Sequence, residues 1–213
     1  MCRHFPAESA RSIEALQKQQ VMATKLAEYI VRKLIAVSVV EEGDRELYVY
    51  GFFLLITRFF FFLVTVAFGV FLKIPCESVI FYIVFILLRS YAGGVHAKTE
   101  VACTIWTTLA IGATVFAIRV LEFSSVKILP LLIVGNLSVF LFSPLENIEK
   151  PVDADSRKEY RTICNVLLVV YDIVAVASLR LGVPVLCYSI VCGLSLEAFL
   201  LVVGKIAAKR RND

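Results

Sequence analysis

The sequence predicts an all-α polytopic membrane protein, with about six transmembrane segments preceded by an amphipathic interfacial helix. Of the 213 residues, 59% are apolar and 19% are charged, and the mean hydropathy is +0.82. A soluble domain of this length exposes too much surface to hold so many apolar residues. The apolar residues are also gathered into six runs, with most Lys and Arg residues between them. These observations exclude an ordinary soluble enzyme and a disordered chain.

The first predicted element is a helix over residues 9–40. Apolar residues recur along one face at steps of three, four or seven: Ile13, Leu16, Ala23, Leu26 or Ala27, Ile30, Leu34 and Val37. Basic residues spaced seven apart follow another face: Arg11, Lys18, Lys25 and Arg32. Such a helix either lies in an anionic membrane surface, or packs on the cytoplasmic end of the bundle or on a second subunit. Residues 41–46 form a polar stop.

Six apolar segments follow, at 47–72, 74–88, 103–121, 128–143, 162–180 and 183–204. A membrane span needs about 20 residues. The first, third, fifth and sixth segments meet this length, whereas the second and fourth are short and begin near Pro75 and Pro130. We therefore expect six spans, and the alternative is four full spans with two partial ones.

Basic residues set the expected orientation. Of the 22 Lys and Arg residues, 17 lie in four stretches, at 1–46, 89–102, 144–161 and 205–213. Because cytoplasmic loops carry an excess of Lys and Arg, both termini and the 89–102 stretch are expected on the cytoplasmic side of the cell membrane. The chain then divides into a cytoplasmic amphipathic region (1–46), a transmembrane domain (47–204) and a basic tail (205–213).

The six cysteines form no C-x-x-C pair and no zinc spacing, so neither a metal nor a cofactor is expected. Four of them lie inside apolar runs and are interpreted as small packing residues: Cys76, Cys164, Cys187 and Cys192. Nucleic-acid binding is not expected either, because no basic stripe is interleaved with aromatic residues.

The stretch from Arg89 to Cys103 is where chemistry is expected. It contains His96, and the thiol of Cys103 follows seven residues later, at the start of an apolar segment. A Cys–His pair can carry out acyl transfer, since the thiolate is the nucleophile and imidazole moves the proton. If Thr99 caps the helix, Cys103 lies near its first turn, where the helix dipole favours the thiolate. The alternative is that both residues are structural.

Spacing limits how this pair could meet. Seven residues of continuous helix separate two side chains by about 10 Å along the axis. That distance exceeds hydrogen-bond reach, so a bend or a returning loop is needed between His96 and Cys103. Gly93 and Gly94 supply conformational freedom just before the histidine.

Arg89, Gly93, Gly94, His96 and Cys103 have the spacing R-x-x-x-G-G-x-H-x-x-x-x-x-x-C. This pattern resembles the signature of the accessory gene regulator B (AgrB-like) family, integral-membrane cysteine endopeptidases that process quorum-sensing propeptides. The stretch from Ser143 to Pro151, followed by Lys158 and Arg161, is similar to the family's proline-, glutamate- and lysine-bearing loop. The resemblance covers nearly the whole chain.

The resemblance implies a role for each residue. Cys103 would be the nucleophile and His96 its general base and acid, while Gly94 would permit the backbone path. Arg89 would hold a propeptide carboxylate or fix the loop by charge-assisted hydrogen bonds. The alternative for Arg89 is an anchor at the membrane boundary. Glu100 and Ser90 are the nearest candidates to orient His96, and the resemblance fixes neither.

The implied reaction cleaves a small amphipathic propeptide through a thioester at Cys103, without a cofactor or metal. An internal Cys or Ser of the peptide can then close a thiolactone or lactone ring. The implied partners are this propeptide and the lipid bilayer, with a homodimer as a further expectation. The active site is expected on the cytoplasmic side of the cell membrane.

Polar residues inside the apolar segments support a second class of function. These are Arg58, Asn136, Asn165, Asp172 and Glu197. Charges at such depth usually face the interior of a bundle and pair, so Arg58 is predicted to pair with Asp172 or Glu197. A transporter or exporter could use them as a relay, whereas a structural pair would only fix the order of the helices. A non-enzymatic membrane scaffold is the third class.

Overall fold

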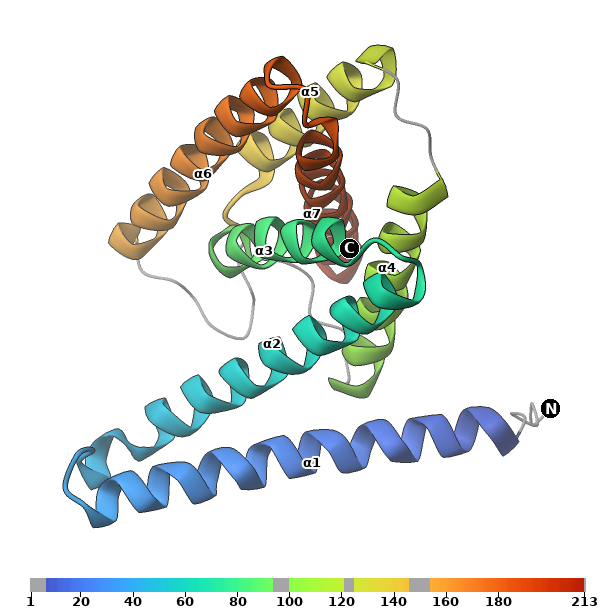
Figure 1. Ribbon diagram of the computed structural model, residues 1–213. Coiled ribbons are helices and arrows are strands. Elements are labelled where there is room, and N and C mark those ends of the chain that lie inside the picture. The colour runs from blue at the N-terminus through green and yellow to red at the C-terminus, as the bar shows by residue number, and fades with distance from the viewer. Residues whose placement is uncertain (1–6, 94–99, 121–124, 146–153, 213) are drawn as a thin grey trace. The chain divides into compact units, whose positions relative to one another are not determined.

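The computed structural model describes residues 7–93, 100–120, 125–145 and 154–212 (Figure 1). Within those ranges every regular element is a helix, in agreement with the all-α prediction. The chain divides into two compact units, one formed by residues 1–63 and 97–108 and the other by residues 64–96 and 109–213. Each unit is described by itself.

The first unit begins with helix α1 (Ala7–Ala36), which confirms a long helix at this end of the chain. A short 3-10 helix, η1 (Glu42–Asp44), leads into α2 (Arg45–Phe71), and α1 and the first part of α2 form a helical hairpin (Figure 1). The buried face of α1 runs through Ala27 and Val31, both 0% exposed. Of the two alternatives in the predicted stripe, Leu26 or Ala27, the buried residue is Ala27, whereas Val37 follows the end of α1 and is exposed.

The helix α1 ends four residues before the predicted end at residue 40. Ser38 adopts a left-handed conformation with φ of 55°. The amide of Val39 donates to the carbonyl of Leu34, and that of Ser38 donates to Ile35. This pair of bonds is a Schellman motif, which satisfies the last carbonyls and turns the chain out of the helix. Apolar periodicity continues past Ser38, so it could not predict this end.

The same motif ends two further helices. Lys73 (φ 61°) follows α2 and Gly182 (φ 74°) follows α6 (Ala154–Arg180). In each case the next helix begins with proline: α3 (Pro75–Ala92) and α7 (Pro184–Asn212). Proline suits the first position of a helix, because its fixed φ is helical and its missing N–H has no partner there. Tight turns therefore join α2 to α3 and α6 to α7.

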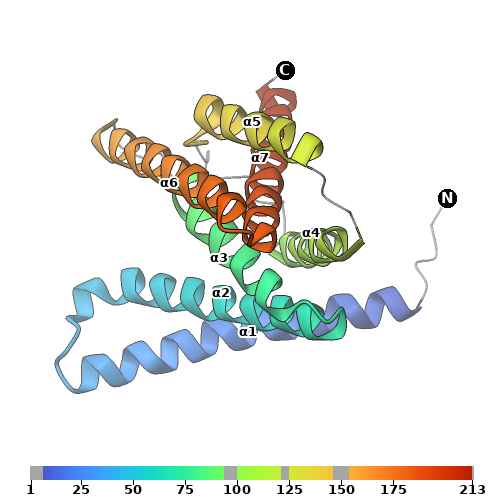
Figure 2. The same ribbon diagram turned by 45° about the horizontal axis from the view of Figure 1, so that its top comes forward.

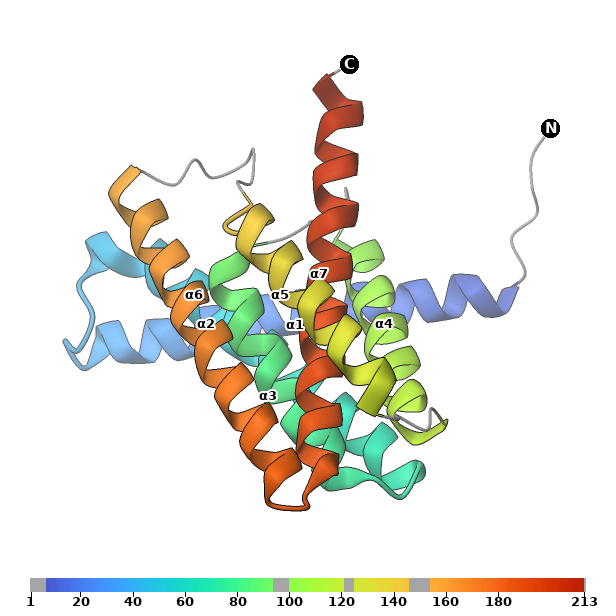
Figure 3. The ribbon, with the colours of Figure 1, turned by 90° about the horizontal axis from the view of Figure 1, so that it is seen from above.

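The second unit is arranged around α7. This helix packs against α3, α5 (Ser125–Phe142) and α6, and α6 also contacts α3 and α5 (Figures 2 and 3). The apolar core lies between these four helices and includes Leu88 of α3, Val139 of α5, Leu168 of α6 and Leu194 of α7. Helix α4 (Glu100–Val120) begins in the first unit and ends in the second.

Six helices, α2 to α7, correspond to the six predicted apolar segments. Among the residues that the structure describes with their side chains, four helical stretches are long and apolar enough to cross a membrane: 42–71, 75–92, 155–180 and 184–206. The described parts of α4 and α5, 104–120 and 128–142, are apolar as well, and the two whole helices have 21 and 18 residues. The short second apolar segment borrows flanking residues, because α3 continues past Leu88 to Ala92 and includes Arg89 in its last turn.

Candidate functional site

The structure describes part of the predicted site. Arg89 lies in the last turn of α3, and Gly93 follows that helix directly. Cys103 is the fourth residue of α4 and Glu100 is its first, but the side chains of both lie outside the described residues. Gly94 and His96 also lie outside the described residues. The geometry that the structure describes is therefore that of the end of α3, three residues before His96 in the sequence.

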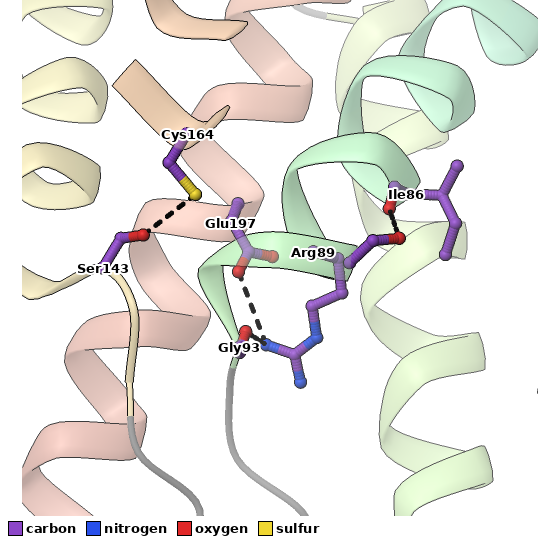
Figure 4. Close-up of polar contacts among 7 residues, drawn as sticks. Ile86, Arg89, Gly93, Ser143, Cys164 and Glu197 are labelled. Atoms are coloured by element: carbon purple, nitrogen blue, oxygen red, sulfur yellow. Dashed lines mark hydrogen bonds and ion pairs between the residues drawn. The ribbon is translucent and has the colours of Figure 1, made fainter. Parts of the chain in front are cut away.

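The guanidinium of Arg89 contacts Gly93, at the end of α3, and Glu197 of α7 (Figure 4). Its Nη1 donates a hydrogen bond of 3.0 Å to the carbonyl oxygen of Gly93. The same nitrogen lies 3.6 Å from Oε1 of Glu197, which projects from α7 and is 0% exposed. Arg89 therefore holds the carbonyl group that directly follows α3, and its role toward a propeptide or the following loop stays a prediction.

The conformation of Gly93 requires glycine. Its φ of 76° lies in a region that other residues rarely adopt. A Cβ atom at this position would also lie 2.6 Å from the carbonyl oxygen of Leu145. This close approach is part of an isolated parallel bridge between Gly93 and Leu145, in which the amide of Leu145 donates to the carbonyl of Ala92 at 2.9 Å.

The bridge joins two stretches that the sequence had singled out separately. Gly93 belongs to the Arg-Gly-Gly-His-Cys pattern, and Leu145 follows Ser143 and Pro144 in the stretch after α5. The Ser143–Pro144 peptide bond is cis. The hydroxyl of Ser143 lies 3.0 Å from Sγ of Cys164, and both residues are buried (Figure 4). The end of α3 is thereby tied to the end of α5 and, through it, to α6.

Other predicted residues have different surroundings. Ser90, a candidate to orient His96, donates its hydroxyl to the carbonyl of Ile86 within α3, at 2.6 Å. Cys164, Cys187 and Cys192 are buried, as expected for packing residues. Cys76 is exposed, so its assignment to packing was wrong. It is the second residue of α3, directly after the turn from α2.

The structure gives both intramembrane carboxylates partners other than the predicted Arg58. Glu197 pairs with Arg89, and Asp172 accepts a hydrogen bond of 2.8 Å from Asn136. Asn136, Asn165 and Asp172 line a groove of about 550 Å³ between α5 and α6. Both carboxylates are therefore held by side chains of the same helical unit, an arrangement typical of structural pairs.

Sequence reasoning missed Glu197 as a residue of this region. It had assigned Arg89 to a loop, whereas Arg89 is inside α3 and faces α7. A charged side chain at the centre of a membrane helix costs roughly 2.5–3.5 kcal/mol on insertion scales, so each one needs a nearby opposite charge. A search for the partner of Glu197 among the basic residues at the ends of the apolar segments would have included Arg89, the partner that the structure shows.

The chain was compared with known proteins. The sequence model of the family "Accessory gene regulator B" matches residues 23–201. Accessory gene regulator protein B of Staphylococcus aureus (strain JH9) is 27% identical over 121 residues, which cover 56% of this chain and 65% of that protein. Putative AgrB-like protein 2 of Clostridium perfringens (strain 13 / Type A) is 25% identical over 141 residues, covering 61% and 66%. The chain thus spans just under two thirds of the length of these relatives. No solved structure matches it.

Proposed function

This chain belongs to the accessory gene regulator B family, and from that membership we propose that it is an integral-membrane cysteine endopeptidase. Its substrate is a small amphipathic signal propeptide of a quorum-sensing system. Cleavage leaves part of the peptide on the enzyme as a thioester, from which the peptide can cyclise to a thiolactone or lactone.

The chemistry is assigned to Cys103 and His96. The thiolate of Cys103 attacks the carbonyl carbon of the scissile peptide bond, while His96 holds the thiol proton. The C–N bond then breaks, the leaving amine takes the proton from His96, and a thioester remains on Cys103. A Cys or Ser of the bound peptide attacks the thioester, closes the ring and restores the Cys103 thiol. The thioester retains the free energy of the activated acyl group, so ring closure needs no ATP at this step.

One observation carries the proposal beyond the family match. The two stretches that resemble the family's motifs are joined by the bridge between Gly93 and Leu145. Motif residues that act in one site must lie near one another in the fold. The bridge supports such a site at the end of α3, three residues before His96.

The distribution of basic residues supports a site on the cytoplasmic side of the membrane. A propeptide with its own surface helix would meet the enzyme within the plane of the membrane. The basic helix α1 suits that encounter, because it carries Arg11, Lys18, Lys25 and Arg32 at spacings of seven. A homodimer is part of the same proposal.

Alkylation of the native cysteines tests the Cys–His pair without a substrate. The protein in nanodiscs is treated with iodoacetamide from pH 5 to 9, and each cysteine is followed by peptide mass mapping. Cys76 is the matched control, because it is an exposed thiol in the same protein. We expect Cys103 to react faster than Cys76 below pH 8, and to lose this advantage in His96→Ala while Cys76 is unchanged. Equal rates for Cys103 in both proteins would contradict the pair.

Capture of the intermediate tests the reaction itself. The protein is purified from cells that contain its propeptide, quenched in acid and digested. A peptide attached to Cys103 and released by neutral hydroxylamine is the expected thioester. No peptide should be released from Cys103→Ser, because a serine hydroxyl forms an ester that resists neutral hydroxylamine. If the wild-type protein releases no such peptide, the result would count against the acyl-enzyme.

A further inference from the structure

Glu197 is the most completely buried acidic side chain that the structure describes. Its side chain is 0% exposed, and neither carboxylate oxygen has a hydrogen-bond partner among the described residues. Replacement of a buried ion pair by apolar residues of similar volume is often neutral or stabilising. Packing of α7 therefore does not require a carboxylate here, since a leucine would fill the same space.

The carboxylate of Glu197 forms an ion pair with the guanidinium of Arg89. Attraction between opposite charges is strong in a buried, poorly polarisable environment. The 3.6 Å approach of Nη1 to Oε1 restrains the long Arg89 side chain, which has many rotamers when it is not held. Restrained in this way, the same Nη1 stays within 3.0 Å of the carbonyl oxygen of Gly93.

Two consecutive carbonyl groups at the end of α3 are held by different parts of the fold. The carbonyl of Ala92 accepts from the amide of Leu145, at 2.9 Å. The carbonyl of Gly93 accepts from Arg89, which is held in turn by Glu197 of α7. Each carbonyl belongs to one peptide group, so holding both carbonyls fixes the orientation of the peptide groups that precede and follow Gly93. The direction in which the chain leaves Gly93 is therefore determined by α7 and by the stretch after α5.

We propose that Glu197 is a positioning residue of the cysteine endopeptidase site, acting through Arg89 and the Gly93 carbonyl on the segment that carries His96. The proposal rests on the proposed function, because it assigns Glu197 to the reaction of Cys103 and His96. Glu197 itself touches no reacting atom. Its contribution is to hold the start of the His96 segment, so that the imidazole meets the thiol.

The first variant is Glu197→Gln, which keeps the shape of the side chain and removes its charge. Its matched control is Glu77→Gln, which removes the same charge in the first turn of α3, at the other end of that helix. The measurement is the alkylation rate of Cys103 relative to Cys76 with iodoacetamide in nanodiscs. We expect Glu197→Gln to lower this ratio by about tenfold, toward its value in His96→Ala, and Glu77→Gln to leave it unchanged.

Hydrogen exchange provides a readout that is independent of catalysis. The amide of Leu145 donates to Ala92, so its exchange reports whether the end of α3 remains held. We expect faster exchange in the peptide containing Leu145 in Glu197→Gln, with unchanged exchange in the middle of α6. Unchanged exchange at Leu145 together with unchanged Cys103 reactivity would overturn the proposal.

A double variant separates positioning from folding. Arg89→Met with Glu197→Leu removes both charges, so that no unpaired charge is buried and the protein should remain folded. Its thermal unfolding temperature is expected at or above that of the wild-type protein. The alkylation of Cys103 should nevertheless be as slow as in Glu197→Gln, because the Gly93 carbonyl has lost the hydrogen bond from Arg89. Wild-type reactivity in this double variant would overturn the proposal. If His96→Ala leaves the alkylation rate of Cys103 at its wild-type value, the proposed function itself fails, and the role of Glu197 in that reaction fails with it.

Discussion

A methyl group added at Gly93 would meet two obstacles. The first is the backbone, since φ of 76° is strained for alanine, and the second is the Leu145 carbonyl oxygen, 2.6 Å from the added carbon. Gly182 offers a matched control, because its φ is 74° but no atom lies within 4 Å of an added Cβ. A comparison of the two positions therefore separates backbone strain from the close contact.

We predict that Gly182→Ala lowers the free energy of unfolding by about 1–3 kcal/mol through backbone strain alone. Gly93→Ala should cost at least ~1 kcal/mol more, because the Leu145 backbone cannot move aside without breaking its bond to Ala92. Unfolding by SDS in mixed micelles measures both. Equal losses would mean that the stretch after α5 moves away from Gly93 at no cost.

At the scale of the helices, α3 and α7 approach closely where Gly193 lies. A Cβ at this position would be 2.8 Å from Cγ1 of Val84 and 3.2 Å from the carbonyl oxygen of Phe81. Small residues permit such close packing of membrane helices. Here the two closely packed helices are those that carry the ion pair, Arg89 on α3 and Glu197 on α7.

Gly193→Ala is predicted to destabilise the protein by about 1–3 kcal/mol, because the helices must separate. The added Val84→Ala should restore only part of this loss, since the contact with the Phe81 backbone remains. The same unfolding titration measures the single and double variants. Full recovery in the double variant would show that the Val84 side chain alone sets the distance between the helices.

The contact of Asn136 with Asp172 joins α5 to α6 in the same way that Arg89 joins α3 to α7. A double-mutant cycle with Asn136→Leu and Asp172→Leu should give a coupling free energy of about 0.6 kcal/mol and at most ~1.7 kcal/mol, as for side-chain hydrogen bonds between other membrane helices. If the pair is structural, neither variant changes the ratio of Cys103 to Cys76 alkylation. A change in transport of a solute with no change in stability would instead favour the relay interpretation.

For the molecule as a whole, local features of the sequence predicted more than the contacts between helices. Hydropathy and spacing are properties of short windows, so they predicted the helices and both motif stretches. The partner of Glu197 depends on how α3 and α7 are rotated about their own axes. These helices are far apart in the sequence, so no short stretch of it contains that information. The end of α1 at Ala36 depends on Ser38, a residue in the left-handed conformation that is not glycine. The side chains of His96 and Cys103 lie outside the described residues, and their pairing stays a prediction.

Two native cysteines test the orientation of the whole chain in the membrane. Cys76 is exposed and follows the turn between α2 and α3, and one span precedes it in the six-span and the four-span arrangement alike. With the N-terminus inside, Cys76 lies outside, and α3 returns the chain so that Cys103 lies inside. A membrane-impermeant maleimide applied to intact cells should therefore label Cys76 and leave Cys103 unlabelled until the cells are permeabilised. Labelling of Cys103 in intact cells would place the proposed nucleophile on the outer face, where a propeptide made in the cytoplasm could not reach it before export.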